Sequence, residues 1–89
     1  MKKEEIICTI DHTLLKQDAT WDQIRDLCME GMESGVASVC IPPSFVKQAA
    51  EFAGEKLPIC TVIGFPNGYQ TSMIKVLEAA QAVKNGADE

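Results

Sequence analysis

Three short apolar runs, each followed by apolar residues at helical spacing, constrain the fold of this chain more than any other feature. The runs cover residues 6–10 (I-I-C-T-I), 36–41 (V-A-S-V-C-I) and 58–63 (P-I-C-T-V-I). Each run is rich in β-branched residues, which predicts a strand buried on both faces. Strands that alternate with helices predict a parallel sheet with right-handed crossovers. We therefore expect an α/β fold with strand order one-two-three and all three helices on one face.

The predicted helices cover residues 20–34, 44–53 and 71–84. Thr20 is a good N-cap for the first of them, and Gln23 three residues later completes a capping box. Ser44 is the predicted cap of the second helix. Gly35 and Gly54 follow these two helices, at the position where a left-handed residue commonly ends a helix. Each helix carries an apolar stripe that we expect in the core, which in the third helix consists of Met73, Val76, Leu77, Ala80 and Val83.

The composition argues against several classes of function. The chain has 89 residues, of which 46% are hydrophobic and 24% charged, as in ordinary globular proteins. A net charge of −5 provides no basic footprint for nucleic acid. No apolar run approaches the ~18 residues of a membrane span, and residues 1–5 lack the apolar core of a signal peptide. We expect one segment over residues 1–89, no second domain, no nucleic-acid or membrane partner, and a cytoplasmic location.

The four cysteines predict reduced thiols. Cys8, Cys28, Cys40 and Cys60 form no C-x-x-C pair, and the single histidine, His12, cannot complete a zinc-finger pattern. Three of the four lie inside apolar runs, where a reduced cysteine behaves as a small hydrophobic residue. We therefore expect no metal, and a reducing compartment.

Candidate catalytic groups follow the predicted strands, since parallel α/β folds gather function at the carboxyl ends of their strands. Asp11 could act as a general base or orient a lysine, and it could equally cap a turn. His12 could be an acid-base group. Cys40 could be a nucleophile beside a cation, or a thiol packed in the core. The chain has no G-x-G-x-x-G and no Walker lysine, so these residues alone name no substrate.

Four segments together resemble deoxyribose-phosphate aldolases. They cover residues 10–16 (I-D-H-T-L-L-K), 37–43 (A-S-V-C-I-P-P), 60–66 (C-T-V-I-G-F-P) and 84–89 (K-N-G-A-D-E). The resemblance implies the amino-terminal part of a (β/α)₈ TIM barrel, with its first three strand-helix units and the lead-in to a fourth strand. It also implies a class I aldolase of deoxyribonucleotide catabolism. Such an enzyme splits 2-deoxy-D-ribose 5-phosphate into acetaldehyde and D-glyceraldehyde 3-phosphate through a lysine Schiff base, without metal or other cofactor.

The same resemblance implies which residues line the substrate pocket. Asp11, Thr13, Cys40 and Phe65 match pocket residues of the family, and we expect them to cluster at one end of the sheet. The family's reactive lysines stand in motifs of the K-T-S-T-G and K-P-A-G-G type, and neither occurs in the 89 residues. The acid-base aspartate would lie beyond Glu89, and Asp88 is the third residue of the G-A-D-E motif rather than the catalytic one. We therefore expect no catalytic residue in this chain and no activity of the chain alone.

Two alternatives to an aldolase segment remain open from the sequence. One is a non-catalytic α/β module such as a receiver-like domain, although Asp11 lacks the acidic neighbours that such a site needs. The other is an assembly fragment with no turnover of its own. For a segment of a barrel, the exposed edges of the first and third strands predict self-association, or association with the rest of the barrel.

Overall fold

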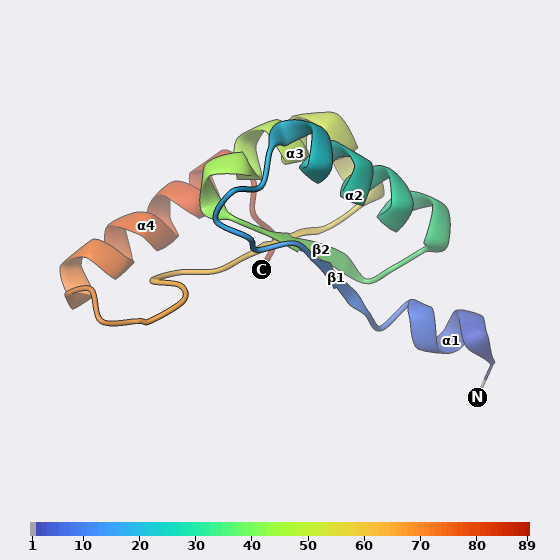
Figure 1. Cartoon of the computed structure of the whole chain (residues 1–89), viewed down its shortest axis with the longest axis horizontal. Coiled ribbons are helices and arrows are strands. Elements are labelled where there is room, and N and C mark those ends of the chain that lie inside the picture. Colours follow the sequence, from blue (N-terminus) through green and yellow to red (C-terminus); the bar gives the residue numbers. More distant parts are fainter. Residues whose placement is uncertain (1) are drawn as a thin grey trace.

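The computed structural model describes residues 2–89, and a parallel sheet of three strands lies at its centre (Figure 1). The strands have the order β1-β2-β3, as predicted. The strands are β1 (Asp11–Thr13), β2 (Ser38–Ile41) and β3 (Ile59–Thr61), and the helices are α1 (Lys3–Ile7), α2 (Trp21–Ser34), α3 (Val46–Ala53) and α4 (Ser72–Asn85). Short 3₁₀ turns, η1 (Pro43–Phe45) and η2 (Gly54–Lys56), flank α3. No helix within residues 2–89 has the length and apolar character needed to cross a membrane.

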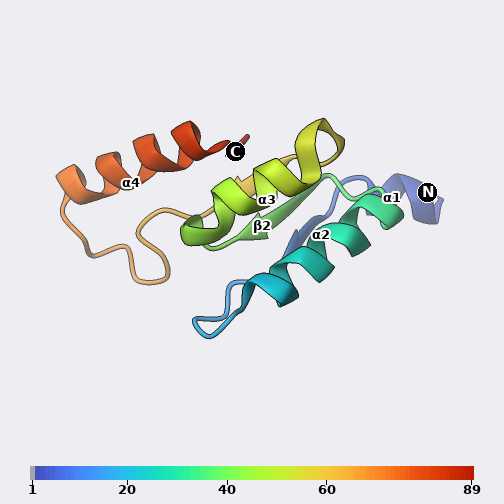
Figure 2. The ribbon, with the colours of Figure 1, turned by 90° about the horizontal axis from the view of Figure 1, so that it is seen from above.

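The core lies between the sheet and the two helices α2 and α3, which cover one face (Figures 1 and 2). Strand side chains alternate between faces, so every second residue of β2 points toward these helices. Gly31 of α2 is buried there, and a Cβ on it would lie 3.1 Å from side-chain atoms of both Val36 and Val39. The helix can therefore approach the sheet closely. The fully buried side chains of this core include Ile24, Cys28, Val39, Ile41, Val46 and Ile59.

The prediction of a first strand at residues 6–10 is wrong. Residues Lys3–Ile7 form helix α1, and the first strand is Asp11–Thr13. Glu4 and Glu5 stand in the first turn of α1, where acidic side chains stabilise the positive end of a helix. A short apolar run does not by itself distinguish strand from helix. As a consequence, Asp11 opens the first strand instead of following it.

The local signals at the helix ends are mostly confirmed. The Thr20 side chain accepts a hydrogen bond from the backbone N–H of Gln23, and the Gln23 side chain accepts one from the backbone N–H of Thr20. Gly35 has φ +73° and ends α2 in the left-handed conformation. Ser44 does not cap α3, because it lies inside η1, which leads directly into the helix. Helix α4 begins after Thr71, whose hydroxyl oxygen accepts from the backbone N–H of Ile74.

Removal of the capping box is expected to destabilise the chain. Thr20→Ala should lower the free energy of unfolding by about 1 kcal/mol, because the backbone N–H of Gln23 loses its side-chain acceptor. Thr71→Ala is the matched comparison. The hydrogen bond from the Ile74 N–H to the Thr71 hydroxyl is 3.5 Å long, against 3.3 Å from the Gln23 N–H to Thr20, so its loss should destabilise the chain less. Thermal unfolding followed by circular dichroism measures both. Equal losses in the two variants would show that the capping box adds nothing.

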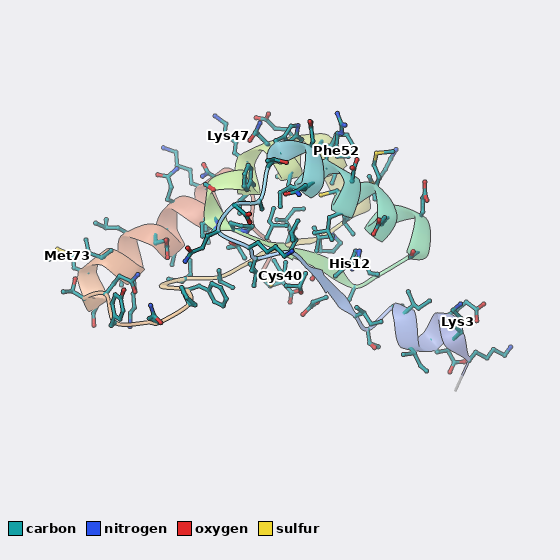
Figure 3. The ribbon with its side chains drawn as sticks, in the orientation of Figure 1. Lys3, His12, Cys40, Lys47, Phe52 and Met73 are labelled. Carbon is teal, nitrogen blue, oxygen red and sulfur yellow. The ribbon has the colours of Figure 1, made fainter. Side chains whose placement is uncertain are left out.

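The apolar stripe of α4 does not lie in the core, contrary to prediction. Helix α4 packs against α3 and extends beyond the sheet (Figures 1 and 2), and Figure 3 shows Met73 at its far end. Ala82 is its one buried residue within the described chain, and Glu78 and Ala79 are partly buried. The exposed side chains on this helix include Met73, Val76, Leu77 and Val83.

The last residues of the chain lie along the outer edge of β3. The backbone N–H of Asp88 donates to the carbonyl of Ile59 (2.7 Å), and the N–H of Thr61 donates to the carbonyl of Glu89 (3.0 Å). The Asp88 carboxylate accepts from the N–H of Ile59 at 2.9 Å. These residues occupy the position of a fourth parallel strand, and the role of Asp88 in the described chain is to hold it there.

Candidate active site

Five polar or thiol side chains belong to the sheet face opposite α2 and α3, which we call the open face. Register pairs Asp11 with Ser38 on neighbouring strands, and it pairs Thr13 with Cys40. Cys40 is in turn the partner of Cys60 on β3. Since directly paired residues of parallel strands point the same way, Thr13, Cys40 and Cys60 form one row across all three strands. Figure 3 shows Cys40 at the centre of the sheet.

Asp11 is anchored to the neighbouring strand although it is exposed. Its Oδ1 accepts a hydrogen bond of 2.6 Å from the Ser38 hydroxyl, and Ser38 is fully buried. The Thr13 hydroxyl donates to the backbone carbonyl of Asp11 at 2.8 Å. A carboxylate fixed in this way can accept a proton or hold a cationic or hydroxyl group at a defined place.

The thiols of the chain differ in their surroundings. The pKa of Cys60 is raised to about 11, mainly by burial and to a smaller extent by the neighbouring Cys40, so this thiol is protonated at neutral pH. Burial also raises the pKa of Cys28, which belongs to α2 and lies in the core. Cys40 is only 9% exposed, which agrees with a packed thiol at the sheet centre.

His12 lies on the opposite face from Asp11 and Thr13. Its Nε2 is 3.0 Å from Oε2 of Glu30 on α2 (Figure 3 shows His12 below this helix). It therefore points away from the open face, and an acid-base role beside Asp11 is not supported.

A hollow of about 400 Å³ lies where the three strands end. The segments after β1, β2 and β3 each contribute to its wall, and α4 closes one side. Phe65 belongs to this wall, is 49% exposed, and precedes Pro66 through a cis peptide bond. The lining residues that carry polar groups on their side chains are Lys16, Gln17, Ser44 and Glu78.

The structure brings together part of the predicted site. Asp11, Thr13 and Cys40 share the open face, but Asp11 lies at the amino end of β1 and only Phe65 lines the hollow. The expectation that all four gather at the carboxyl end is therefore wrong for Asp11. Sequence reasoning also missed Ser38 and Glu78. The period of two along β2 could have indicated Ser38, which stands two residues before Cys40, whereas Glu78 required the tertiary structure.

Glu78 fixes the loop that carries Phe65. Its Oε1 accepts a hydrogen bond of 2.6 Å from the backbone N–H of Gly64, which is buried. Gly64 has φ +64°, and a Cβ there would lie 3.1 Å from Oε1 of Gln70. A left-handed backbone and a crowded site together require glycine at this position. The loop geometry thus depends on one carboxylate from α4.

Glu78→Ala is expected to loosen this loop. The Gly64 amide would lose a charged acceptor, a change that typically costs about 1.5–3 kcal/mol. Glu78→Gln keeps an oxygen acceptor at the same place and should retain most of the effect. Amide hydrogen exchange at Gly64 measures both variants. Unchanged exchange in Glu78→Ala would show that the carboxylate does not hold the loop.

Comparisons with known proteins decide the family. Residues 5–89 match the model of the DeoC/LacD family aldolases. The chain belongs to this family. It is 57% identical over 86 residues to a deoxyribose-phosphate aldolase of Clostridioides difficile (strain 630), covering 97% of this chain and 39% of that protein. It is 54% identical over 89 residues to that of Streptococcus pyogenes serotype M4 (strain MGAS10750), covering 100% of this chain and 40% of the relative.

Solved structures of the family support the predicted fold class. The tetrameric deoxyribose phosphate aldolase of Aeropyrum pernix superposes with a TM-score of 0.90 at 30% identity, covering 94% of this chain and 36% of that one. The chain therefore spans about 40% of the length of the curated relatives it matches. The predictions of the family and of an α/β fold that forms the amino-terminal part of a TIM barrel are confirmed.

Proposed function

We propose that the chain supplies the first three strands of a class I deoxyribose-phosphate aldolase. In the longer protein, 2-deoxy-D-ribose 5-phosphate would be split into acetaldehyde and D-glyceraldehyde 3-phosphate through a lysine Schiff base. The names of the relatives support this reaction. The observation that carries the proposal is the anchored Asp11 carboxylate, exposed on the face that a closed barrel turns inward.

The chemistry of each proposed pocket residue suits it to a different role. Asp11 is the one anionic group of the proposed set and would hold a substrate hydroxyl or orient the reactive ammonium group. Thr13 offers a hydroxyl that can rotate to donate or accept. Cys40 provides a compact wall at the sheet centre, and Phe65 an apolar one over the hollow. The lysine nucleophile and the acid-base aspartate would come from later strands of the barrel.

A chimera tests this assignment without requiring activity from 89 residues. This chain replaces the matched segment of the Clostridioides difficile relative, to which it is 57% identical. The chimera is expected to cleave 2-deoxyribose 5-phosphate. In it, Asp11→Asn should lower kcat/KM by about 100-fold, because the substrate or the lysine loses a positioning group. Asp18→Asn, at an exposed loop position after β1, is the matched control and should leave the rate unchanged.

Two results would contradict the proposal. One is a chimera that folds, as judged by circular dichroism and sedimentation, yet cleaves no substrate. The other is an Asp11→Asn chimera with the activity of its parent.

We further propose a cytoplasmic location, in keeping with four cysteines that are all free.

A further inference from the structure

Two of the four cysteines face each other across neighbouring strands. Cys40 of β2 and Cys60 of β3 are direct register partners in a parallel ladder. We propose that Cys40 and Cys60 form a reversible dithiol–disulfide pair on the open face, which a small-molecule disulfide such as oxidised glutathione can close. This inference rests on the strand register and does not depend on the aldolase activity.

The backbone geometry permits the bond. Neighbouring strands lie about 4.7–4.9 Å apart, and disulfides join Cα atoms that are about 4.4–6.8 Å apart. Paired residues of parallel strands also point their Cβ atoms to the same side, as a disulfide requires. Cys40 is also close enough to Cys60 to be one of the causes that raise the pKa of the Cys60 thiol.

The other two thiols are placed differently, which makes the pairing selective. Cys28 is fully buried in the core between α2 and the sheet, on the opposite side from the open face. Cys8 is exposed just after α1, where its Sγ donates to the carbonyl of Glu5. Neither is a register partner of Cys40 or Cys60.

The chemistry is two successive thiol–disulfide exchanges. The thiolate of one cysteine attacks a sulfur of oxidised glutathione, forms a mixed disulfide and releases one reduced glutathione. The thiolate of its neighbour then attacks the protein sulfur of that mixed disulfide and releases the second. Two protein thiols are oxidised, the glutathione disulfide is reduced, and the two protons lost by the protein end on the two glutathione molecules.

The local environment sets the rate and the reversibility. Partial burial, and then the neighbouring Cys40, raise the pKa of Cys60 to about 11, so its thiolate is scarce at pH 7 and becomes more abundant as the pH rises. Closure should therefore be slow at neutral pH and faster in mild alkali. A disulfide held inside a sheet must adapt to the fixed strand positions, and strained disulfides are more easily reduced.

Mass spectrometry of the full chain tests the proposal. The Cys8→Ser variant removes the exposed thiol, which would otherwise join separate molecules. It is treated with oxidised glutathione under native conditions, quenched in acid, unfolded and alkylated. We expect the loss of two of the three alkylatable thiols, with a protein lighter by two hydrogens and restored by dithiothreitol. Digestion with trypsin and a glutamate-specific protease maps the link, because cleavage at Glu30 separates Cys28 from Cys40.

Further variants make the result decisive. In the same background, Cys40→Ser and Cys60→Ser should each abolish the internal link, while Cys28→Ala should leave it intact. Circular dichroism shows whether each variant keeps its fold. If a variant does not fold, the cross-linked peptide mapped in the Cys8→Ser parent decides the outcome. A link to Cys28, stable glutathione adducts on Cys40 or Cys60, or three thiols still open to alkylation would overturn the proposal.

Discussion

The 89-residue chain, incubated alone with 2-deoxyribose 5-phosphate and borohydride, is expected to form no covalent adduct and to show no turnover above background. A Schiff base needs an amine that loses its proton easily, which proteins achieve by burial or by a second nearby cation. Lys16 is the single cation among the described residues that line the hollow, and it is exposed. The family resemblance instead assigns the reactive lysine to a later strand.

The active chimera is the positive control for this experiment. Relative to it, the isolated chain should lose at least about 10⁴-fold in rate, since removal of a nucleophile leaves only residual catalysis. Mass spectrometry after borohydride reduction detects an adduct directly. A reduced adduct on Lys16, accompanied by turnover, would show that the chain carries its own nucleophile.

The elements that the sequence predicts best are those governed by neighbours along the chain. Thr20 and Gln23 form a capping box through contacts three residues apart, and Gly35 ends the helix through its own backbone conformation. None of these depends on how the rest of the chain folds, so local chemistry suffices. The order of the strands followed from short crossovers and their handedness.

The errors fall where tertiary contacts decide. Residues 6–10 have the composition of a buried strand, yet Ile6 and Ile10 are exposed. The stripe of α4 has the spacing of a core face, yet Val76 and Leu77 are exposed as well. Apolar spacing shows which side of a helix needs a partner, but it does not show that a partner is present.

The site shows the same division between local and long-range information. The period of two along β1 puts Asp11 and Thr13 on one face, and this follows from the sequence once the strand is located. The contacts Asp11–Ser38 and Cys40–Cys60 require the register between strands. Glu78 reaches Gly64 across fourteen positions of the chain, from a helix whose packing the spacing alone misplaced.

At micromolar concentration the pure chain is expected to sediment as a species larger than its monomer mass of 9.7 kDa. Five apolar side chains of α4 are more than half exposed: Met73 at 73%, Ile74 at 51%, Val76 at 66%, Leu77 at 61% and Val83 at 70%. At ~25 cal/mol per Å², burial of a few hundred Å² between copies would contribute several kcal/mol, which is comparable to the stability of a small domain.

Charge variants on α4 locate the contact. The double variant Leu77→Lys with Val83→Lys should shift the chain toward the monomer, because it places two cations in the apolar surface. Gln81→Lys, at an exposed polar position of the same helix, is the matched control. The chain carries a net charge of −5, so added lysines reduce repulsion between copies and would by themselves favour association. Dissociation of the double variant would therefore report the lost apolar contact.

The exposed edge of the sheet is the competing contact between copies. The free energies of the two contacts favour the apolar surface of α4. Strand β1 has three residues and pairs with β2 on one side, so its outer edge can form only a few intermolecular hydrogen bonds. Each such bond contributes about 0.5–1.5 kcal/mol net, before the entropy of association is subtracted. The outer edge of β3 already pairs with Asp88 and Glu89. If the double variant stays associated while Ile10→Lys, beside the start of β1, dissociates, the edge is the contact after all. A single 9.7 kDa species of the unchanged chain with cooperative unfolding would contradict both routes and show that three strand-helix units are stable alone.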